Sequence, residues 1–342
     1  MTHNYAIDRI KFLAAMAVVL IHVTAFLETE GLATFANYYW YRHLLNFAVP
    51  FFFATTGYLV AQQKDTTSYL RRYLTKILVM YVVFTLFYLL VDAFIFVPTS
   101  MAMGASFPNA LLQYWHTLSW VKVGNGQIGH YHLWYLWALF LASLILYWCV
   151  KRGWSPTQIV VGAVVIYLVG RWLITVNLHW ELLANGGFPK ALVSLVGGYY
   201  VAKRNLAWRG GLVAALIILF AYQALSLSDI HFFAGEFVLI LAIWVLMTYV
   251  NARPGKSSPL SRWAAYSMEI YLFHPILLTI YSYSSNVEPD IEIQSHGWRI
   301  ILMTCTTVAI SIFLYPYFDR FYIQPMEKRL EPFFDRLVRP LT

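Results

Sequence analysis

The chain has 342 residues, of which 60% are hydrophobic and only 12% are charged. Soluble domains usually carry about 25% charged residues, so a soluble protein of this composition would lack a polar surface. We therefore take the lipid bilayer as the solvent of this chain. The formal net charge of +8 then needs an explanation other than a nucleic-acid partner, and the placement of the basic residues supplies one.

Apolar segments recur along the whole chain. A membrane-spanning helix needs about 20 mainly apolar residues, and ten segments approach that length. They lie near residues 10–28, 44–62, 76–97, 133–150, 157–175, 190–202, 210–227, 231–249, 264–283 and 299–318. Since the segment 190–202 is short and contains two adjacent glycines, it either crosses the bilayer or re-enters it. We predict an all-α, polytopic integral membrane protein with about ten transmembrane helices, folded as a single domain over residues 1–342.

The basic residues follow the positive-inside rule, under which Lys and Arg gather on the cytoplasmic side of a membrane protein. With the N-terminus in the cytoplasm, five of the 24 Lys and Arg residues fall in outer segments, namely Arg42, Lys122, Arg171, Lys190 and Arg299. The bias holds at every second connection. We therefore expect an even number of spans, both termini in the cytoplasm and no nucleic-acid partner.

Two segments outside the apolar runs stand out. The longest outer connection, residues 98–131, is rich in Gly, aromatic and polar residues, and is either a lid or acceptor platform or an ordinary ordered loop. Residues 319–342 alternate charges with Leu and Phe, so we expect a cytoplasmic amphipathic tail along the inner leaflet. Cys149 and Cys305 fall in or at the end of apolar spans, and they indicate neither a disulfide framework nor a metal site.

Lys11 and His22 bracket the first apolar run. An ionisable side chain at membrane depth costs at least about 2.5–3.5 kcal/mol, so each one suggests a functional site. Eleven residues of helix turn through about 1100°, or three turns plus roughly 20°, so the two side chains share one face about 16 Å apart. Such a face suits an anionic headgroup on Lys11 with a thin arm reaching His22. The alternative is a snorkelling Lys and a His bonded to a neighbouring helix.

A basic cluster precedes the third predicted span. Arg71, Arg72 and Lys76 occur in RRYLTK, and Arg72 and Lys76 are one helical turn apart. Like charges at this spacing are destabilising unless an anion lies between them. The positive-inside bias alone also accounts for the cluster, so the sequence leaves both explanations open.

Three acidic or imidazole groups lie in later spans. Glu269 and His274 are five residues apart, about 140° around a helix, so we expect them to face different neighbours. Pro275 should disturb the backbone bonding beside His274. Glu269 either pairs with a basic residue at the rim or belongs to a site. For Asp92, near the outer end of the third span, capping or contact with another helix is expected.

Taken together, four motifs resemble the membrane acyltransferase-3 family, the integral-membrane O-acyltransferases that modify envelope carbohydrates. They are Lys11 followed by His22 in IDRIKFLAAMAVVLIHVT, VPFFFATTGYL at 49–59, HLWYL at 132–136 and YSMEIYLFHP at 266–275. The chain is most similar to the compact O-acetyltransferases of the enterobacterial-common-antigen type. It departs from the family pattern in having Thr56 where Ser is common, Lys11 where Arg is commoner, and Val79 in place of a proline.

The resemblance implies a donor and a base. The donor would be acetyl-CoA or another acyl-CoA on the cytoplasmic side, a co-substrate that needs no metal. Its phosphates would be bound by Lys11, Arg71, Arg72 and Lys76. His22 would act as general base on an acceptor hydroxyl or would itself attack the thioester to form an acyl-imidazole. Glu269 is the second candidate catalytic residue.

The resemblance also implies an acceptor, a hydroxyl of a cell-envelope or exported carbohydrate, and a location in the cytoplasmic membrane of a bacterium. The candidate substrate-binding residues are His132, Trp134, Tyr135, Thr56, Tyr271 and His274. The aromatic residues among them would equally suit an interfacial belt. The main alternative is a proton-coupled transporter or glycolipid flippase, which would use intramembrane His and acidic groups as a proton relay. That alternative gives no reason for the cytoplasmic Lys/Arg cluster.

Overall fold

The regular elements that the structure describes are all helical. The computed structural model describes residues 3–29, 39–175, 187–227, 232–285 and 296–340. In these ranges the chain forms α-helices, short 3₁₀-helices and a π-helical turn, and no β-strand. The predicted all-α class is confirmed.

The chain divides into two compact units, each built from segments that are distant in sequence. Unit 1 comprises residues 1–63 and 193–320, and unit 2 comprises residues 64–192 and 321–342. The expected single domain over residues 1–342 stays a prediction.

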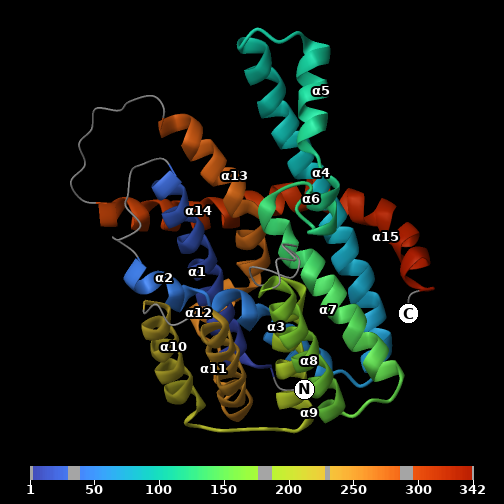
Figure 1. The fold of residues 1–342 in the computed structure, drawn as a ribbon, viewed down its shortest axis with the longest axis vertical. Coiled ribbons are helices and arrows are strands. Elements are labelled where there is room, and N and C mark those ends of the chain that lie inside the picture. The colour runs from blue at the N-terminus through green and yellow to red at the C-terminus, as the bar shows by residue number, and fades with distance from the viewer. Residues whose placement is uncertain (1–2, 30–38, 176–186, 228–231, 286–295, 341–342) are drawn as a thin grey trace. The chain divides into compact units, whose positions relative to one another are not determined.

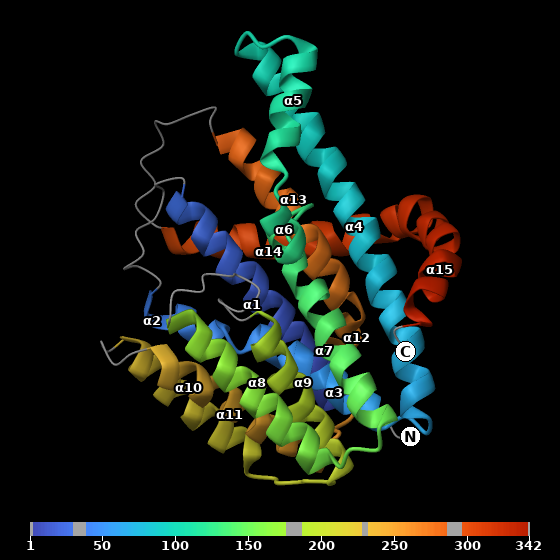
Figure 2. The same cartoon turned by 45° about the vertical axis from the view of Figure 1, so that its right-hand side comes forward.

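Unit 1 contains the N-terminal helices and most of the helices in the C-terminal part of the chain. Its elements are α1 (Tyr5–Thr29), α2 (Tyr39–Leu45), α3 (Ala48–Ala61), α10 (Gly211–Leu227), α11 (Phe232–Ala252), α12 (Pro259–Trp263), η3 (Ala264–Tyr266), α13 (Ser267–Ser285) and α14 (His296–Phe318) (Figure 1). Helix α9 (Phe188–Lys203) belongs to it from residue 193 onward. Helix α1 packs against α3, α12, α13 and α14, and α10 lies along α11 (Figure 2).

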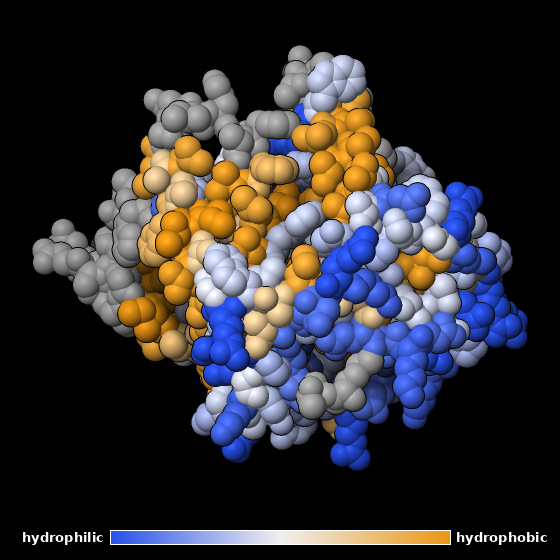
Figure 3. Space-filling view, turned by 90° about the horizontal axis from the view of Figure 1, so that it is seen from below, coloured by the Kyte–Doolittle hydropathy of each residue, from blue (hydrophilic) through white to orange (hydrophobic). Residues whose placement is uncertain are grey.

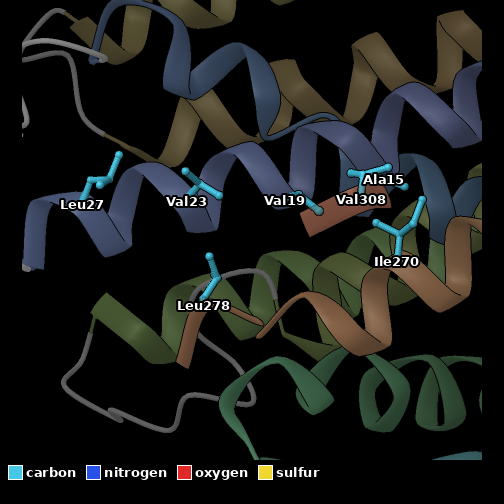
Figure 4. Close-up of a cluster of buried hydrophobic side chains, with 7 residues drawn as sticks. All are labelled: Ala15, Val19, Val23, Leu27, Ile270, Leu278 and Val308. Carbon is cyan, nitrogen blue, oxygen red and sulfur yellow. The ribbon is translucent and has the colours of Figure 1, made fainter. Parts of the chain in front are cut away.

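A row of aliphatic side chains on α1 forms the core between α1, α13 and α14. Residues four apart lie on the same face of a helix, and Ala15, Val19, Val23 and Leu27 follow that spacing. Figure 4 shows this row along α1, with Ile270 and Leu278 of α13 opposite it, and Val308 of α14 completes the cluster. The packing holds α1 and α13 side by side over the length that carries their ionisable residues.

Glycines allow α3 and α9 to approach each other closely. A Cβ at Gly57 would overlap the backbone carbonyl of Leu195, and a Cβ at Gly198 would overlap the carbonyl of Ala54. The short Gly-containing segment predicted at 190–202 is therefore a regular helix, α9, whose glycines serve close packing rather than a break in the helix.

Unit 2 is organised around α4 (Thr66–Ala102), a helix of 37 residues. The other elements are α5 (Phe107–Thr117), α6 (Trp120–Gly124), η2 (Tyr131–Leu133), α7 (Trp134–Lys151), α8 (Pro156–Thr175) and α15 (Gln324–Val338), which follows the π-helical turn η4 (Asp319–Ile323). Helices α5, α7 and α15 pack on α4. The Asp65 side chain caps the start of α4 by accepting a hydrogen bond of 3.0 Å from the Ser68 amide.

The connection 98–131, which was predicted to lie on the outer side, is more regular than a loop. Helix α4 continues through Pro98 to Ala102, and α5 and α6 follow it. The indole of Trp137 donates a hydrogen bond of 3.0 Å to the Gly124 carbonyl, which ties the end of α6 to α7. A role of this segment as lid or acceptor platform stays a prediction.

The C-terminal segment is helical as well. The Tyr322 hydroxyl donates to the Val83 carbonyl at 3.1 Å, and Phe334 and Val338 are buried, whereas Phe333 and Leu337 are exposed. Helix α15 thus has an apolar face that is packed within unit 2 and further apolar side chains on its outside. Its position along the inner leaflet stays a prediction.

The helices are suited to a bilayer. Seven helical segments of the described ranges are long and apolar enough to cross a membrane: Tyr5–Leu27, Tyr41–Ala61, Thr66–Ala102, Tyr131–Lys151, Pro156–Ile174, Gly235–Ala252 and Ile300–Val338. Large hydrophobic side chains such as Phe94, Phe220 and Ile301 are exposed, and hydrophobic residues cover broad areas of the surface in Figure 3. These features indicate a multi-pass membrane protein, while the count of ten spans and the cytoplasmic termini stay predictions.

Candidate active site

Two histidines from opposite ends of the chain lie ring to ring in unit 1. The imidazoles of His22 in α1 and His274 in α13 are stacked, with ring centroids 5.0 Å apart and planes inclined by 25°. His274 is fully buried, whereas His22 is half-buried. Because each ring can accept or donate a proton, the α1–α13 interface contains a pair of groups suited to acid–base chemistry, and His22 is the more accessible of the two.

The orientation of His274 is fixed by its own helix. Its Nδ1 atom lies 3.2 Å from the carbonyl oxygen of Ile270, one turn earlier. Since a carbonyl oxygen only accepts, we assign the hydrogen to Nδ1, which leaves the lone pair of the neutral ring on Nε2. The Tyr271 ring lies 6.0 Å from the His274 ring. Of the two predicted substrate-binding residues of α13, His274 is thus a member of the histidine pair and Tyr271 lies beside it.

Lys11 and Glu269 form a charged group on the same two helices. The charges of Lys11 and Asp319 act on the Glu269 carboxyl, and its Oε2 atom is buried without a hydrogen-bond partner among the described residues. Lys11 and His22 thus both interact with α13, as their eleven-residue spacing predicts. Glu269 and His274, expected to face different neighbours, both interact with α1. Electrostatic interactions act over longer distances than packing contacts. Two side chains on different faces of one helix can therefore both interact with the same neighbouring helix.

Thr56 lies in the same unit as the histidine pair. It is half-buried in α3, which packs against α1, and its hydroxyl donates a hydrogen bond of 3.1 Å to the Phe52 carbonyl. The hydroxyl that the family motif retains is therefore bonded to its own helix in this structure.

The other predicted donor-binding residues belong to unit 2. Arg71, Arg72 and Lys76 are all exposed near the start of α4. Arg72 and Lys76 lie one turn apart on its surface, so an anion can reach both without entering the interior of the unit.

The predicted acceptor residues lie at the start of α7 in unit 2. His132 and Tyr135 are buried, and Trp134 is half-buried. His132 and Tyr135 are therefore part of the interior of the unit, and Trp134 is the more accessible of the three.

His130 is a candidate that the sequence reading missed. Its Nδ1 atom lies 2.8 Å from Nδ1 of His132, and the Tyr88 ring packs against both imidazoles, at 4.8 Å and 4.9 Å between centroids. Burial lowers the pKa of His130 to about 4, so this ring is neutral at neutral pH. The H-Y-H spacing was visible in the sequence, but the contact of the two rings depends on the 3₁₀ turn at residues 131–133.

Asp92 is an interior residue of α4 and does not cap it. Its carboxyl interacts electrostatically with the Lys122 ammonium of α6, and it also acts on the neutral Tyr114 hydroxyl of α5. Of the two expected roles, contact between helices is the one that the structure supports.

No group of three or more His, Cys, Asp or Glu side chains converges in the described parts of the chain in a way that could hold a metal ion. Cys149 is buried and Cys305 is exposed, and both are free thiols.

Comparison with known proteins shows which family the chain resembles. Residues 4–316 match the family described as acyltransferase domain, of the acyltransferase-3 type. A protein of Enterococcus faecalis named amino-acid racemase is 25% identical over 276 residues, which cover 73% of this chain and 36% of that protein. The chain thus spans little more than one third of that relative, and the relative's name does not say what the matching part does. No solved structure matches the chain.

Proposed function

Because the chain belongs to the acyltransferase-3 family, we propose that it is an integral-membrane O-acyltransferase. It moves an acetyl or other acyl group from cytoplasmic acyl-CoA to a hydroxyl of a cell-envelope or exported carbohydrate, in the cytoplasmic membrane of a bacterium. The observation that carries the proposal is the stacked pair of His22 and His274 between apolar helices. Ionisable groups are costly at membrane depth and are retained there for function.

His22 is the proposed general base. It accepts the proton of the acceptor hydroxyl while the hydroxyl oxygen attacks the carbonyl carbon of the thioester. The bond between that carbon and sulfur then breaks, and the thiolate of CoA leaves with the proton returned by His22. A positioned base of this kind contributes about 10²- to 10⁴-fold to the rate. In a second route, a ring nitrogen of His22 attacks the thioester carbonyl and the C–S bond breaks to release CoA. The acceptor hydroxyl then attacks the acyl-imidazole, and the C–N bond breaks as the imidazole takes up the hydroxyl proton.

His274 and Glu269 are proposed to position the reacting groups. The stacking of His274, held by Ile270, restricts the rotation of the His22 ring. The carboxyl of Glu269 and the ammonium of Lys11 attract each other at the cytoplasmic end of the same helices. Tyr271 completes the wall beside the two imidazoles.

The donor is proposed to be bound through its phosphates. Arg71, Arg72 and Lys76 are exposed cations on α4. The repulsion between Arg72 and Lys76 decreases when an anion binds between them. Lys11 of unit 1 is a further cation proposed for the donor. On the acceptor side, Trp134, Tyr135 and His132 of unit 2 and Thr56 of unit 1 are the proposed contacts.

The test is the release of CoA thiol from acetyl-CoA by the purified protein in nanodiscs. We expect release that is stimulated by a glycan extract of the bacterial envelope, and that falls at least about 100-fold in His22→Ala. His116→Ala is the matched control, because His116 is an exposed histidine at the end of α5, and it should retain full activity.

The outcomes separate the rival functions. Stimulated release that is unchanged in His22→Ala would keep the enzyme and remove His22 from its chemistry. Absence of release and of acetyl-CoA binding, together with a proton-driven flux of solute, would favour the transporter or flippase instead. The unpartnered carboxyl oxygen of Glu269 is the feature that such a proton relay would use.

A further inference from the structure

Helix α15 carries exposed cations and exposed apolar side chains on one face. Arg329 is followed after four, seven and eight residues by Phe333, Arg336 and Leu337, a spacing that keeps side chains on one side of a helix. All four side chains are exposed, and Phe333 and Leu337 retain 60% and 49% of their surface. We call these four residues the outer face of α15.

The opposite side of α15 fixes the direction of the outer face. Phe334 and Val338 are buried, and at 100° per residue they lie on the side of the helix away from Arg329. Helix α15 packs on α4 within unit 2. Because this packing occupies one side of α15, the outer face points away from the interior of the unit and is open to the surroundings of the protein.

The cations of the outer face are not neutralised by the acidic residues of the same helix. Arg339 forms a salt bridge of 2.7 Å with Asp335, so that pair carries no net charge. Neither Arg329 nor Arg336 forms a salt bridge with an acidic residue in the parts of the chain that the structure describes. Glu331 lies about 200° from Arg329 around the helix. The outer face therefore combines positive charge with large apolar side chains.

Helix α15 lies beside the first half of α4. Tyr322, just before α15, is bonded to the Val83 carbonyl in the middle of α4. In Figures 1 and 2 the end of the chain marked C lies beside the part of α4 that precedes this contact. That part carries Arg71, Arg72 and Lys76, which the positive-inside rule assigns to the cytoplasm. In the predicted topology, the outer face of α15 thus lies near the inner surface of the bilayer.

We propose that the outer face of α15 binds anionic phospholipids of the inner leaflet. Arg329 and Arg336 attract the negatively charged headgroups, while Phe333 and Leu337 enter the boundary between headgroups and acyl chains. A zwitterionic lipid carries no net charge and gains less from the two arginines. The predicted position of residues 319–342 along the inner leaflet requires no particular lipid, so the selectivity for anionic lipid goes beyond it. Lipid binding of this kind does not depend on the proposed acyl transfer.

The test compares two lipids beside the outer face. The exposed Cys305 is replaced by Ser, and a bimane fluorophore is attached through Pro332→Cys, an exposed position one turn from both arginines. The labelled protein is placed in phosphatidylcholine nanodiscs with a small fraction of nitroxide-labelled phosphatidylglycerol or nitroxide-labelled phosphatidylcholine. We expect phosphatidylglycerol to quench the fluorophore more strongly. The difference between the two lipids should decrease at high salt, because salt screens exposed charges.

Substitutions of single charges show which cations bind the lipid. Arg329→Gln and Arg336→Gln should each lower the affinity for phosphatidylglycerol relative to phosphatidylcholine about fivefold. Arg152→Gln, which removes an exposed cation after α7, is the matched control and should retain the preference. The double variant Asp335→Asn and Arg339→Gln removes the neutral pair and should also retain it. Because Arg329 and Arg336 are exposed, their replacement should not change the melting temperature in phosphatidylcholine nanodiscs.

Three results would overturn the inference and leave the proposed acyl transfer intact. The first is equal quenching by the two lipids. The second is a preference for phosphatidylglycerol that Arg152→Gln lowers as much as Arg329→Gln and Arg336→Gln do, because the general surface potential would then account for it. The third is loss of quenching by phosphatidylglycerol when an excess of CoA is added, because the cations of α15 would then bind the donor instead of a lipid.

Discussion

Gly57 of α3 lies so close to Leu195 of α9 that a Cβ atom at position 57 would overlap the Leu195 carbonyl group. The relationship is mirrored one turn away, where Gly198 of α9 lies against the backbone of Ala54. Two helices in a membrane associate through such close backbone contact, which small residues permit. The glycine in VPFFFATTGYL is thus required by packing, and it holds in place the helix that also carries Thr56.

We expect Gly57→Ala to destabilise the protein, because the added methyl group meets backbone atoms that cannot move aside. Overpacking of this kind costs typically about 1–3 kcal/mol, which would appear as a lower melting temperature in nanodiscs. Gly162→Ala is the control, since a Cβ there would meet only the Trp154 ring at 3.8 Å and Ala favours a helix interior over Gly by about 1 kcal/mol. Equal stability of both variants would show that α3 and α9 have room to separate.

The sequence predicted the helices well and their ends less well. Apolar runs mark the spans because a helix must be apolar to cross the bilayer, and each of the ten predicted segments overlaps a helix in the described parts of the chain, whereas α5 and α6 were not predicted. The extension of α4 past Pro98 to Ala102 was not, because the Pro, Gly and polar residues of 98–131 are typical of loops. What keeps that end helical is packing of α5 on α4, with the Tyr114 hydroxyl donating to the Leu89 carbonyl at 2.8 Å.

The site was foreseen only in part, for a physical reason. Helical periodicity predicts which side chains share a face, and it placed Lys11 and His22 together. It does not predict which helix lies opposite, so the pairing of His22 with His274 required the fold.

His274 should matter more for turnover than for binding. His274→Ala removes the stacked ring from His22, and we expect kcat to fall about 10- to 100-fold with little change in the KM values, since a misplaced base is a typical cause of such losses. His274→Asn keeps a donor for the Ile270 carbonyl and should recover part of the stability but not the activity. His116→Ala, at an exposed histidine outside the site, is the control. Loss of folding alone would lower the stability of the Ala variant without lowering the kcat of the folded fraction.

His130 makes the stability of the protein depend on pH. Its pKa is lowered from 6.5 to about 4 by burial, so the folded state favours the neutral ring. The stabilisation is complete above about pH 6.5 and is lost progressively as the pH falls toward 4. Its ring neighbours are His132, Tyr88 and Tyr131.

We therefore expect the melting temperature of the wild type to fall more between pH 7.5 and pH 5 than that of His130→Gln. Glutamine retains a hydrogen-bonding group beside His132 and cannot take up the proton. When the pH-dependent change in melting temperature of His130→Gln is subtracted from that of the wild type, the contributions of all other titrating groups cancel. If the melting temperatures of both proteins fell equally with pH, the His130 ring would be hydrated enough to be protonated without a cost in stability.

The spacing of Arg72 and Lys76 provides a test of the donor site. Both cations are exposed one turn apart on α4, and their repulsion is relieved by a bound anion. We expect Arg72→Ala and Lys76→Ala each to raise the KM for acetyl-CoA about tenfold, with a smaller dependence of that KM on salt, because salt screens interactions between exposed charges. The free protein should become no less stable. Arg152→Ala, an exposed cation after α7, is the control and should leave the kinetics unchanged. If all three variants changed the KM alike, the cations would act through the general surface potential, and the specific phosphate site on α4 would be ruled out.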